Sequence, residues 1–172
     1  MNRFINISNK SINIKQLKIE NANLDYLNII NNANNFIESK KKYTNKYHLR
    51  NFIIKTNKSQ NILLLGIFYE YIHIGNIKFE FINNGEAILG ILIGNKKYQR
   101  KKIFSNVLKT LEPKLRYSLN IHTLYLGVHK QNKPAFKAFT SSGFKITSWK
   151  KETRYNQLIM KKKISYAKHS KI

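Results

Sequence analysis

Apolar and polar positions along the chain repeat with two different periods, and one stretch near its middle combines both. The apolar run Ile88-Leu89-Gly90-Ile91-Leu92-Ile93 predicts a buried strand. After a short cationic turn, apolar residues recur every four positions and predict a helix with one buried face: Ile103, Val107, Leu111 and Leu115. A strand, a basic turn and a helix N-terminus direct backbone N–H groups at one place, which suits a phosphate. The alternative is an ordinary strand–helix connection whose charges are solvated.

Three further strands are predicted before this stretch. Alternating residues indicate a strand at residues 11–19, and an apolar run indicates another at residues 61–70. A turn near Tyr71 opens the third, in which one face is apolar: Ile77, Phe79 and Phe81. The sequence Asn83-Asn84-Gly85 predicts a hairpin that leads from this strand into the central one.

Two helices are predicted between the first and second of these strands. Asn21 or Asn23 can cap the first, whose apolar residues are Leu24, Leu27 and Ile30. The second is expected at residues 46–56, with an inward face of Leu49, Phe52 and Ile53.

The C-terminal third continues with alternating elements. Pro113 is expected to kink the central helix, and Asn120 stands where a left-handed cap is needed. A strand is expected around residues 124–128, then a helix that begins at Asn132-Lys133-Pro134 and ends at Gly143. The buried face of that helix is expected to be Ala135, Phe136 and Phe139. Strands at about residues 144–149 and 155–160 follow, and the basic chain from Lys161 is expected to fray. We place a single domain at residues 1–163 and a basic tail at residues 164–172.

Composition limits the class of protein. The 172 residues fit one domain, and 42% hydrophobic content is typical of a globular chain. The absence of cysteine excludes disulfides and thiolate zinc sites, and the histidines show no metal-ligand spacing. The first residues lack a signal-peptide core, and no apolar run reaches the roughly 18 residues of a membrane span. We therefore expect a cytoplasmic protein without a metal and without a membrane partner.

The net charge is strongly positive, at +24 from 32 basic and 8 acidic residues. Such a charge attracts nucleic acid, acidic proteins, anionic membranes or phosphorylated small molecules. The basic residues are scattered in short runs and do not interleave with aromatics as a base-stacking surface requires. Any nucleic-acid binding is therefore expected to be nonspecific.

Three segments resemble the GNAT superfamily of N-acetyltransferases, in particular its ribosomal-protein N-terminal and sugar-nucleotide amine acetyltransferases. The first is the central strand and turn at residues 89–98, and the second is the strand at residues 73–78. The third and most specific is Asn132-x-x-Ala135-x-x-x-Phe139-x-x-x-Gly143-Phe144 after a strand, which matches the family pattern except at Phe139. The resemblance runs from about Ile12 to Met160.

The resemblance implies an α/β (α+β) fold with a splayed mixed sheet of about seven strands and about four helices. Acetyl-CoA is then expected between the two central parallel strands. The backbone at Leu92 and Ile93 would pair with the pantetheine amides, and Asn132 and Phe139 would line its far arm. The turn of Gln99, Arg100, Lys101, Lys102, Ile103 and Phe104 would hold the pyrophosphate.

Two departures from the family pattern bear on activity. The family's phosphate turn carries small residues where this chain has Lys102 and Phe104, and glycine there lets the backbone approach the phosphates. Phe139 stands where many members place a tyrosine that protonates the departing thiolate. A thiolate with a pKa near 8–9 is still a tolerable leaving group.

A general base is also required, because an amine is mostly protonated at neutral pH. Many relatives carry Glu at the position of Ile88; the candidates here are Glu86 on the same face, Glu80 on the neighbouring strand, and His129. Each can instead be an ordinary surface polar residue. The sequence thus supports an acetyl-CoA-dependent N-acetyltransferase with a degenerate cofactor loop, acting as a monomer or homodimer. The alternative is a catalytically impaired GNAT-fold module that binds CoA or an anionic partner. The acceptor amine stays open between a protein N-terminus, an amino sugar and a polyamine.

Overall fold

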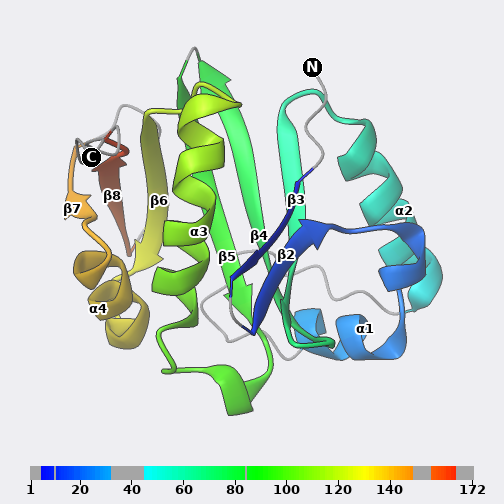
Figure 1. Cartoon of the computed structure of the whole chain (residues 1–172). Helices are drawn as coiled ribbons and strands as arrows, with labels where there is room; N and C mark the ends of the chain where they lie inside the picture. The colour runs from blue at the N-terminus through cyan, green and yellow to red at the C-terminus, as the bar shows by residue number, and fades with distance from the viewer. Residues whose placement is uncertain (1–4, 10, 32–44, 84, 149–155, 166–172) are drawn as a thin grey trace.

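The computed structural model of the chain describes residues 5–9, 11–31, 45–83, 85–148 and 156–165. In this described part, one eight-stranded sheet runs in the order β1-β2-β3-β4-β5-β6-β8-β7 (Figure 1). The strands are β1 (Asn6–Asn9), β2 (Ile12–Gln16), β3 (Ile62–Tyr69), β4 (Ile72–Asn83), β5 (Glu86–Ile93), β6 (Thr123–His129), β7 (Lys145–Ile146) and β8 (Gln157–Lys163). The α-helices are α1 (Leu24–Asn31), α2 (Lys46–Lys58), α3 (Ile103–Tyr117) and α4 (Lys133–Ser141), with short 3-10 turns η1 (Ile19–Asn21) and η2 (Lys96–Tyr98). The expected mixed α/β class is confirmed.

The helices bury both faces of the sheet, in two separate cores. The larger core lies between the sheet and α3, whose predicted stripe of Ile103, Val107, Leu111 and Leu115 is fully buried. The smaller core lies under α1 and α2, where Leu49 and Ile53 pack with Leu64 of β3. The alternating side chains of β3 thereby contribute to both layers.

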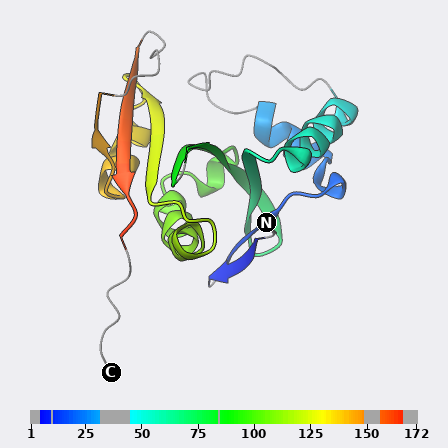
Figure 2. The ribbon, with the colours of Figure 1, turned by 90° about the horizontal axis from the view of Figure 1, so that it is seen from above.

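The two central strands, β5 and β6, are parallel and pair over a short length. Their register joins Glu86 to Thr123, Ala87 to Leu124 and Ile88 to Tyr125, and no later residues are paired among those described. In contrast, β5 stays paired with β4 as far as Ile93, and β6 stays paired with β8 over its whole length. The sheet therefore divides into two wings that diverge after Ile88, as the view from above shows (Figure 2).

Most predicted elements are present, and four details differ. The strand β1 was not predicted, because three of its four residues are polar and exposed and Ile7 alone gives no alternating pattern. In α1 the cap is Asn23, whose Oδ1 accepts from the Tyr26 amide at 2.9 Å. Tyr26 and Ile29 form the buried face of α1, and the Leu24 side chain is 58% exposed.

The other differences concern the C-terminal strands. The expected fraying from Lys161 is wrong, because β8 continues to Lys163, which pairs with Thr123. The backbone of Ile164 then donates to the His122 carbonyl at 2.8 Å. The expected strand at residues 144–149 shortens to β7, and residues 149–155 lie outside the described residues, as does Asn84 of the predicted hairpin.

Three local predictions are confirmed by the backbone. Asn120 has the left-handed conformation, with φ 52°, and Gly143 ends α4 with φ 90°. Asn132 caps α4, since its Oδ1 accepts from the Ala135 amide at 3.2 Å. The helix α3 continues through Pro113 to Tyr117. No helix in the described ranges has the length and apolarity to cross a membrane.

Candidate functional site

A pocket of about 340 Å³ lies where β5 and β6 have diverged, between the end of β5 and the first turns of α3 and α4. It contains all the residues expected to bind a cofactor except Lys101. The lining also includes residues that were not predicted: Ile91, Tyr98, Pro134, Ala135 and Ala138. The helical period from Asn132 could have indicated Ala135 and Ala138, which share a face with Phe139.

The turn at the mouth of the pocket is fixed to the strand that precedes it. The side-chain amide of Gln99 donates to the Ile93 carbonyl at 2.8 Å. Arg100 and Lys102 adopt left-handed backbone conformations, with φ 61° and φ 56°. The glycine of the family pattern matches such a conformation, and here Lys102 adopts it at a cost of about 1–2 kcal/mol. Lys102 thus has the left-handed backbone conformation that a glycine would adopt without strain.

The N-terminus of α3 opens into this turn. Lys102 occupies the cap position and its side chain makes no capping bond. The first-turn amides of an α-helix have no partner within the helix, and the helix dipole gives that end a partial positive charge. Arg100 and Lys102 both line the pocket and add full positive charges there. This end of the pocket is suited to an anion.

Lys101 is oriented differently from its neighbours. Its ammonium lies 5.7 Å from the centroid of the Tyr98 ring, a cation–π distance, and it does not line the pocket. The structure therefore does not bring this predicted residue to the site.

The opposite end of the pocket is apolar and aromatic. The Phe139 ring is 8% exposed and lies edge-on to Phe104, with ring centroids 4.9 Å apart. Phe144 packs behind both rings, 6.2 Å from each. The bulky Phe104 is thus part of a packed aromatic wall and does not close the pocket. No hydroxyl is available on this wall at Phe139 to donate a proton.

The two predicted carboxylates lie outside this pocket, on the other face of the sheet. Glu80 is paired in register with Ile88, and Ile88 is paired with Tyr125 on the next strand. Glu86 lies on the same face, and its Oε1 accepts from the Tyr125 hydroxyl at 3.1 Å. Glu86 thus reaches toward β6 at the position where the strands begin to diverge.

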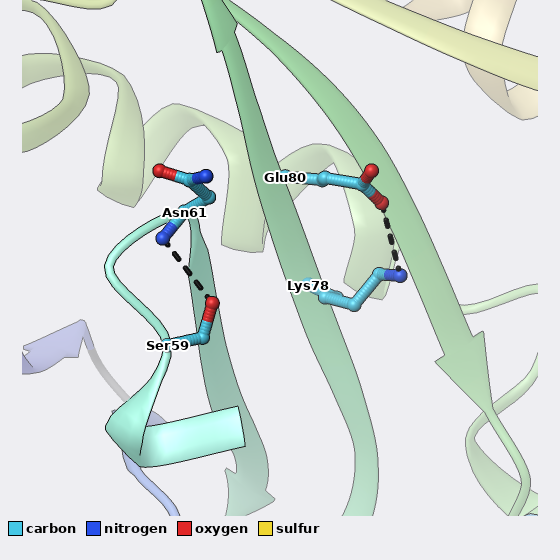
Figure 3. A network of polar contacts seen from close by, with 4 residues as sticks. All are labelled: Ser59, Asn61, Lys78 and Glu80. Carbon is cyan, nitrogen blue, oxygen red and sulfur yellow. Dashed lines mark hydrogen bonds and ion pairs between the residues drawn. The ribbon is translucent and has the colours of Figure 1, made fainter. Parts of the chain in front are cut away.

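Glu80 is directed elsewhere. Its carboxylate lies 3.6 Å from the ammonium of Lys78, and both side chains are about two-fifths exposed, at 42% and 40% (Figure 3). An exposed pair of this kind contributes little to stability. Figure 3 also shows the bond from the Asn61 amide to Ser59 Oγ, which connects α2 to β3 beside this face. The third candidate base, His129, lies at the end of β6, where its Nδ1 accepts a hydrogen bond from the Gln131 backbone amide at 3.2 Å.

Gly90 lies on the same face as Glu86 and Ile88, two residues beyond the last paired position. A Cβ built at Gly90 has no heavy atom within 4 Å among the described residues. This part of β5 is therefore open, and it lies beside the gap between the strands. The face of the sheet that carries Glu80 and Glu86 and the pocket on the opposite face therefore lie on either side of the gap between β5 and β6.

The described residues contain no group of three or more histidine, aspartate or glutamate side chains that could hold a metal ion. Comparisons with known proteins agree with this geometry, although no family model matches the chain. Spermidine N(1)-acetyltransferase of Thermoplasma acidophilum is 32% identical over 130 residues, which are 74% of this chain and 76% of that protein.

Solved structures give a similar result. The PaiA N-acetyltransferase of Thermoplasma acidophilum, crystallised with coenzyme A, is 28% identical with a TM-score of 0.70, over 89% of this chain and 99% of that one. The microcin C7 self-immunity acetyltransferase MccE, in complex with acetyl-CoA and AMP, has a TM-score of 0.76 at 22% identity, over 91% and 94%. RimL, a ribosomal L7/L12 α-N-protein acetyltransferase, has a TM-score of 0.81 at 14% identity, over 93% and 98%. The last two similarities concern the fold.

Proposed function

The chain belongs to the GNAT superfamily of acetyltransferases, and from this premise we propose that it transfers an acetyl group from acetyl-CoA to a primary amine. The observation that carries the proposal is the pocket between β5 and the N-termini of α3 and α4, which is cationic at its mouth and apolar inside. Acetyl-CoA has the matching form, with an anionic pyrophosphate followed by a pantetheine arm that ends in the thioester. The catalytic unit we propose is residues 1–163.

The mouth of the pocket binds the pyrophosphate in this proposal. The amides of the first turn of α3, together with Arg100 and Lys102, face the phosphates. Gln99 and Ile103 form walls of this end, and Phe104 continues from it into the aromatic wall. Holding an anion in this way orients the rest of the cofactor along β5.

The pantetheine arm then runs along the unpaired part of β5. Beyond Ile88 the edge of β5 that faces β6 has no strand partner among the described residues, and the pantetheine amides are placed along this edge, at Leu92 and Ile93. The Ile93 carbonyl accepts from the side chain of Gln99, so a pantetheine amide that pairs with it replaces that bond. Asn132 and Phe139 line the α4 side of this path. The thioester is thereby directed toward Gly90, where the other face of the sheet is open.

The reaction we propose is direct attack within a ternary complex. The amine nitrogen attacks the thioester carbonyl carbon, the carbon–sulfur bond breaks, and coenzyme A leaves as the thiolate. Glu86, held by Tyr125 at the point of divergence, accepts the proton that the amine loses. Glu80 adds negative charge near an ammonium acceptor. Because Phe139 cannot donate, the thiolate takes its proton from solvent, and holding both reactants together supplies much of the rate.

The acceptor we propose is a protein N-terminus or an amino sugar. A net charge of +24 repels a polycation, and Lys78 adds a positive charge on the acceptor face. The similar protein from Thermoplasma acidophilum is named for spermidine, so a polyamine belongs in any panel of acceptors.

The experiment that tests the proposal measures release of coenzyme A thiol from acetyl-CoA with a panel of amines. The panel contains glucosamine, glucosamine 6-phosphate, a peptide with a free N-terminal serine or alanine, and spermidine. Turnover with a peptide or an amino sugar supports the proposal. Binding of coenzyme A without turnover on any amine supports the alternative, a catalytically impaired module.

A further inference from the structure

A second and larger pocket, of about 950 Å³, lies on the far side of the end of β5 from the cofactor pocket. It is an open pocket bordered by β2, α1, the turn between β3 and β4, and the chain that leaves β5, which meet near the lower end of the molecule in Figure 1. None of its described lining residues is shared with the cofactor pocket. Its lining is Lys15, Asn21, Asn23, Asp25, Asn28, Ile29, Phe68, Tyr71, Ile72, His73, Gly94, Asn95 and Lys96.

The rim of this pocket is rich in hydrogen-bond donors. Three of its asparagines use their side-chain oxygens to accept backbone amides: Asn21 from Lys18, Asn23 from Tyr26 and Asn95 from Lys97. With its oxygen engaged, each of these side chains offers its NH₂ group to a ligand.

Two ammonium groups reinforce this donor character. Lys15 and Lys96 both line the pocket, and the ammonium of Lys15 is located 4.5 Å over the ring of Phe68. Asp25 is the one carboxylate in the described lining. Charge and donors therefore favour an anion, for which a phosphate is well suited.

The inner wall carries an acceptor that the protein leaves unused. His73 is 8% exposed, its ring stacks on Phe68 at 4.5 Å, and its Nε2 bonds the Gly75 carbonyl at 2.9 Å. Burial lowers the pKa of His73 from 6.5 to about 4; the bond to Gly75 and the nearby Asp25 raise it, and Lys15 lowers it further. The ring is therefore neutral near pH 7, with its proton on Nε2 because Nε2 must donate to a carbonyl.

Nδ1 of His73 is consequently a buried acceptor to which no described residue donates. A buried unsatisfied acceptor costs about 1–3 kcal/mol. His73 and Asp25 both line the pocket, so ligand hydroxyls placed on this side would lie near the carboxylate and near the His73 ring, while leaving the cationic rim for a phosphate.

We propose that this second pocket binds a sugar phosphate, with its phosphate at Lys15 and Lys96 and its hydroxyls toward Asp25 and His73. The site is independent of acetyl transfer and of the cofactor pocket. It is connected to the cofactor turn through the backbone, because Gly94 and Asn95 both donate to the Ile74 carbonyl, next to His73, at 3.1 and 3.4 Å.

Isothermal titration calorimetry with glucose 6-phosphate tests this proposal. This probe has no amine, so its binding is independent of whether the protein is an acetyltransferase. We expect binding at millimolar concentrations or tighter, at least about tenfold tighter than with glucose or inorganic phosphate. Equal affinity for inorganic phosphate would show a simple anion site, and equal affinity for glucose would show that charge plays no part; either result overturns the proposal. No binding at 20 mM also overturns it.

Variants locate the binding. The double variant Lys15→Met with Lys96→Met should weaken glucose 6-phosphate at least about tenfold, since it removes both cations from the rim. Lys58→Met removes an exposed cation at the end of α2 and should leave the affinity unchanged. His73→Phe keeps a stacking ring and removes the acceptor, and a weaker affinity is expected there too. Full displacement of the probe by coenzyme A would place it in the cofactor pocket and refute the second site.

Discussion

The hydroxyl of Tyr125 on β6 donates to Oε1 of Glu86 on β5 at 3.1 Å, across the three residue pairs that hold these parallel strands together. The bond holds a carboxylate at the position where the strands separate. A general base located there could reach an amine that approaches the thioester through the gap. Glu80, on the other side of Ile88, is instead drawn toward Lys78.

Removing the Glu86 carboxylate should lower turnover without changing the affinity for coenzyme A. For Glu86→Gln we expect kcat to fall by about 10²–10⁴, the range for a general base. Tyr125→Phe keeps the carboxylate and loses its orientation, so a smaller fall is expected. The matched change Glu80→Gln should alter the KM for the amine more than kcat. Steady-state kinetics with coenzyme A binding measured in parallel test this, and an unchanged kcat in Glu86→Gln excludes that residue as the base.

The cationic turn should be required for cofactor binding. Coenzyme A is expected to raise the melting temperature of the wild-type protein through ligand linkage. The double variant Arg100→Glu with Lys102→Glu should abolish that rise, because both side chains line the pocket. Lys101→Glu makes the same change of charge in the same turn but outside the pocket, so it should keep most of the rise. Equal losses in both variants would indicate a general effect of charge, and no stabilisation of the wild type by millimolar coenzyme A would argue against the proposed function.

The open position at Gly90 should tolerate a side chain in the folded protein but not in the reaction. Gly90→Val adds a residue that favours strands, and no described atom lies near the new Cβ. We expect unchanged or slightly higher stability, by up to about 1 kcal/mol, and an unchanged shift with coenzyme A. The kcat/KM for the amine should fall about tenfold or more, since the side chain blocks the approach to the thioester. Gly90→Ala is the graded control, and normal amine kinetics in both variants would move the acceptor path elsewhere.

The sequence predicts those features of the site that depend on residues close together in the chain, and it misses those that depend on tertiary contacts. The cap at Asn132, the stop at Gly143 and the face that carries Phe139 follow from one helix and its ends, and each is found as predicted. The left-handed turn at Lys102 was not predicted, because the sequence there lacks the glycine that normally marks such a conformation. Tertiary contacts decide it, since Gln99 fixes the turn to Ile93.

The second pocket had no sequence signal at all. Its walls come from residues 15 to 96, which are brought together by the pairing of β2, β3, β4 and β5. Tertiary contacts also explain why Leu24 is exposed. The cap at Asn23 sets the rotation of α1, so that Tyr26 faces the core and its hydroxyl accepts from the Asn76 side chain. Hydrophobic periodicity identifies a helix, but the contacts that the helix makes with the rest of the protein decide which of two adjacent faces is buried.

Stability should decrease with acid through His73. Its pKa is about 4 in the folded protein and 6.5 when exposed, so the unfolded chain takes up a proton that the folded protein excludes. Stability is therefore lost as the pH falls from about 6.5 toward 4, by at most about 3.5 kcal/mol, since one pKa unit corresponds to about 1.4 kcal/mol. His73→Phe should flatten the dependence of melting temperature on pH over this range. His48→Gln, which removes an exposed histidine, is the control with which the slope of His73→Phe is compared.

Phe139 distinguishes a weak enzyme from an inactive one. Its ring lines the cofactor pocket and touches Phe104 edge-on, so Phe139→Tyr adds one hydroxyl at nearly constant volume on the wall nearest the thioester. If the pocket holds acetyl-CoA and an amine, we expect that hydroxyl to protonate the leaving thiolate and to raise turnover by about tenfold to a hundredfold. Phe144→Tyr is the matched control, because Phe144 is 1% exposed in the same aromatic cluster but does not line the pocket. Its buried hydroxyl should cost about 1–3 kcal/mol of stability without any kinetic gain. Turnover and melting temperature measured for both variants test the assignment, and a destabilised Phe139→Tyr protein with unchanged turnover would show that Phe139 is only part of the core.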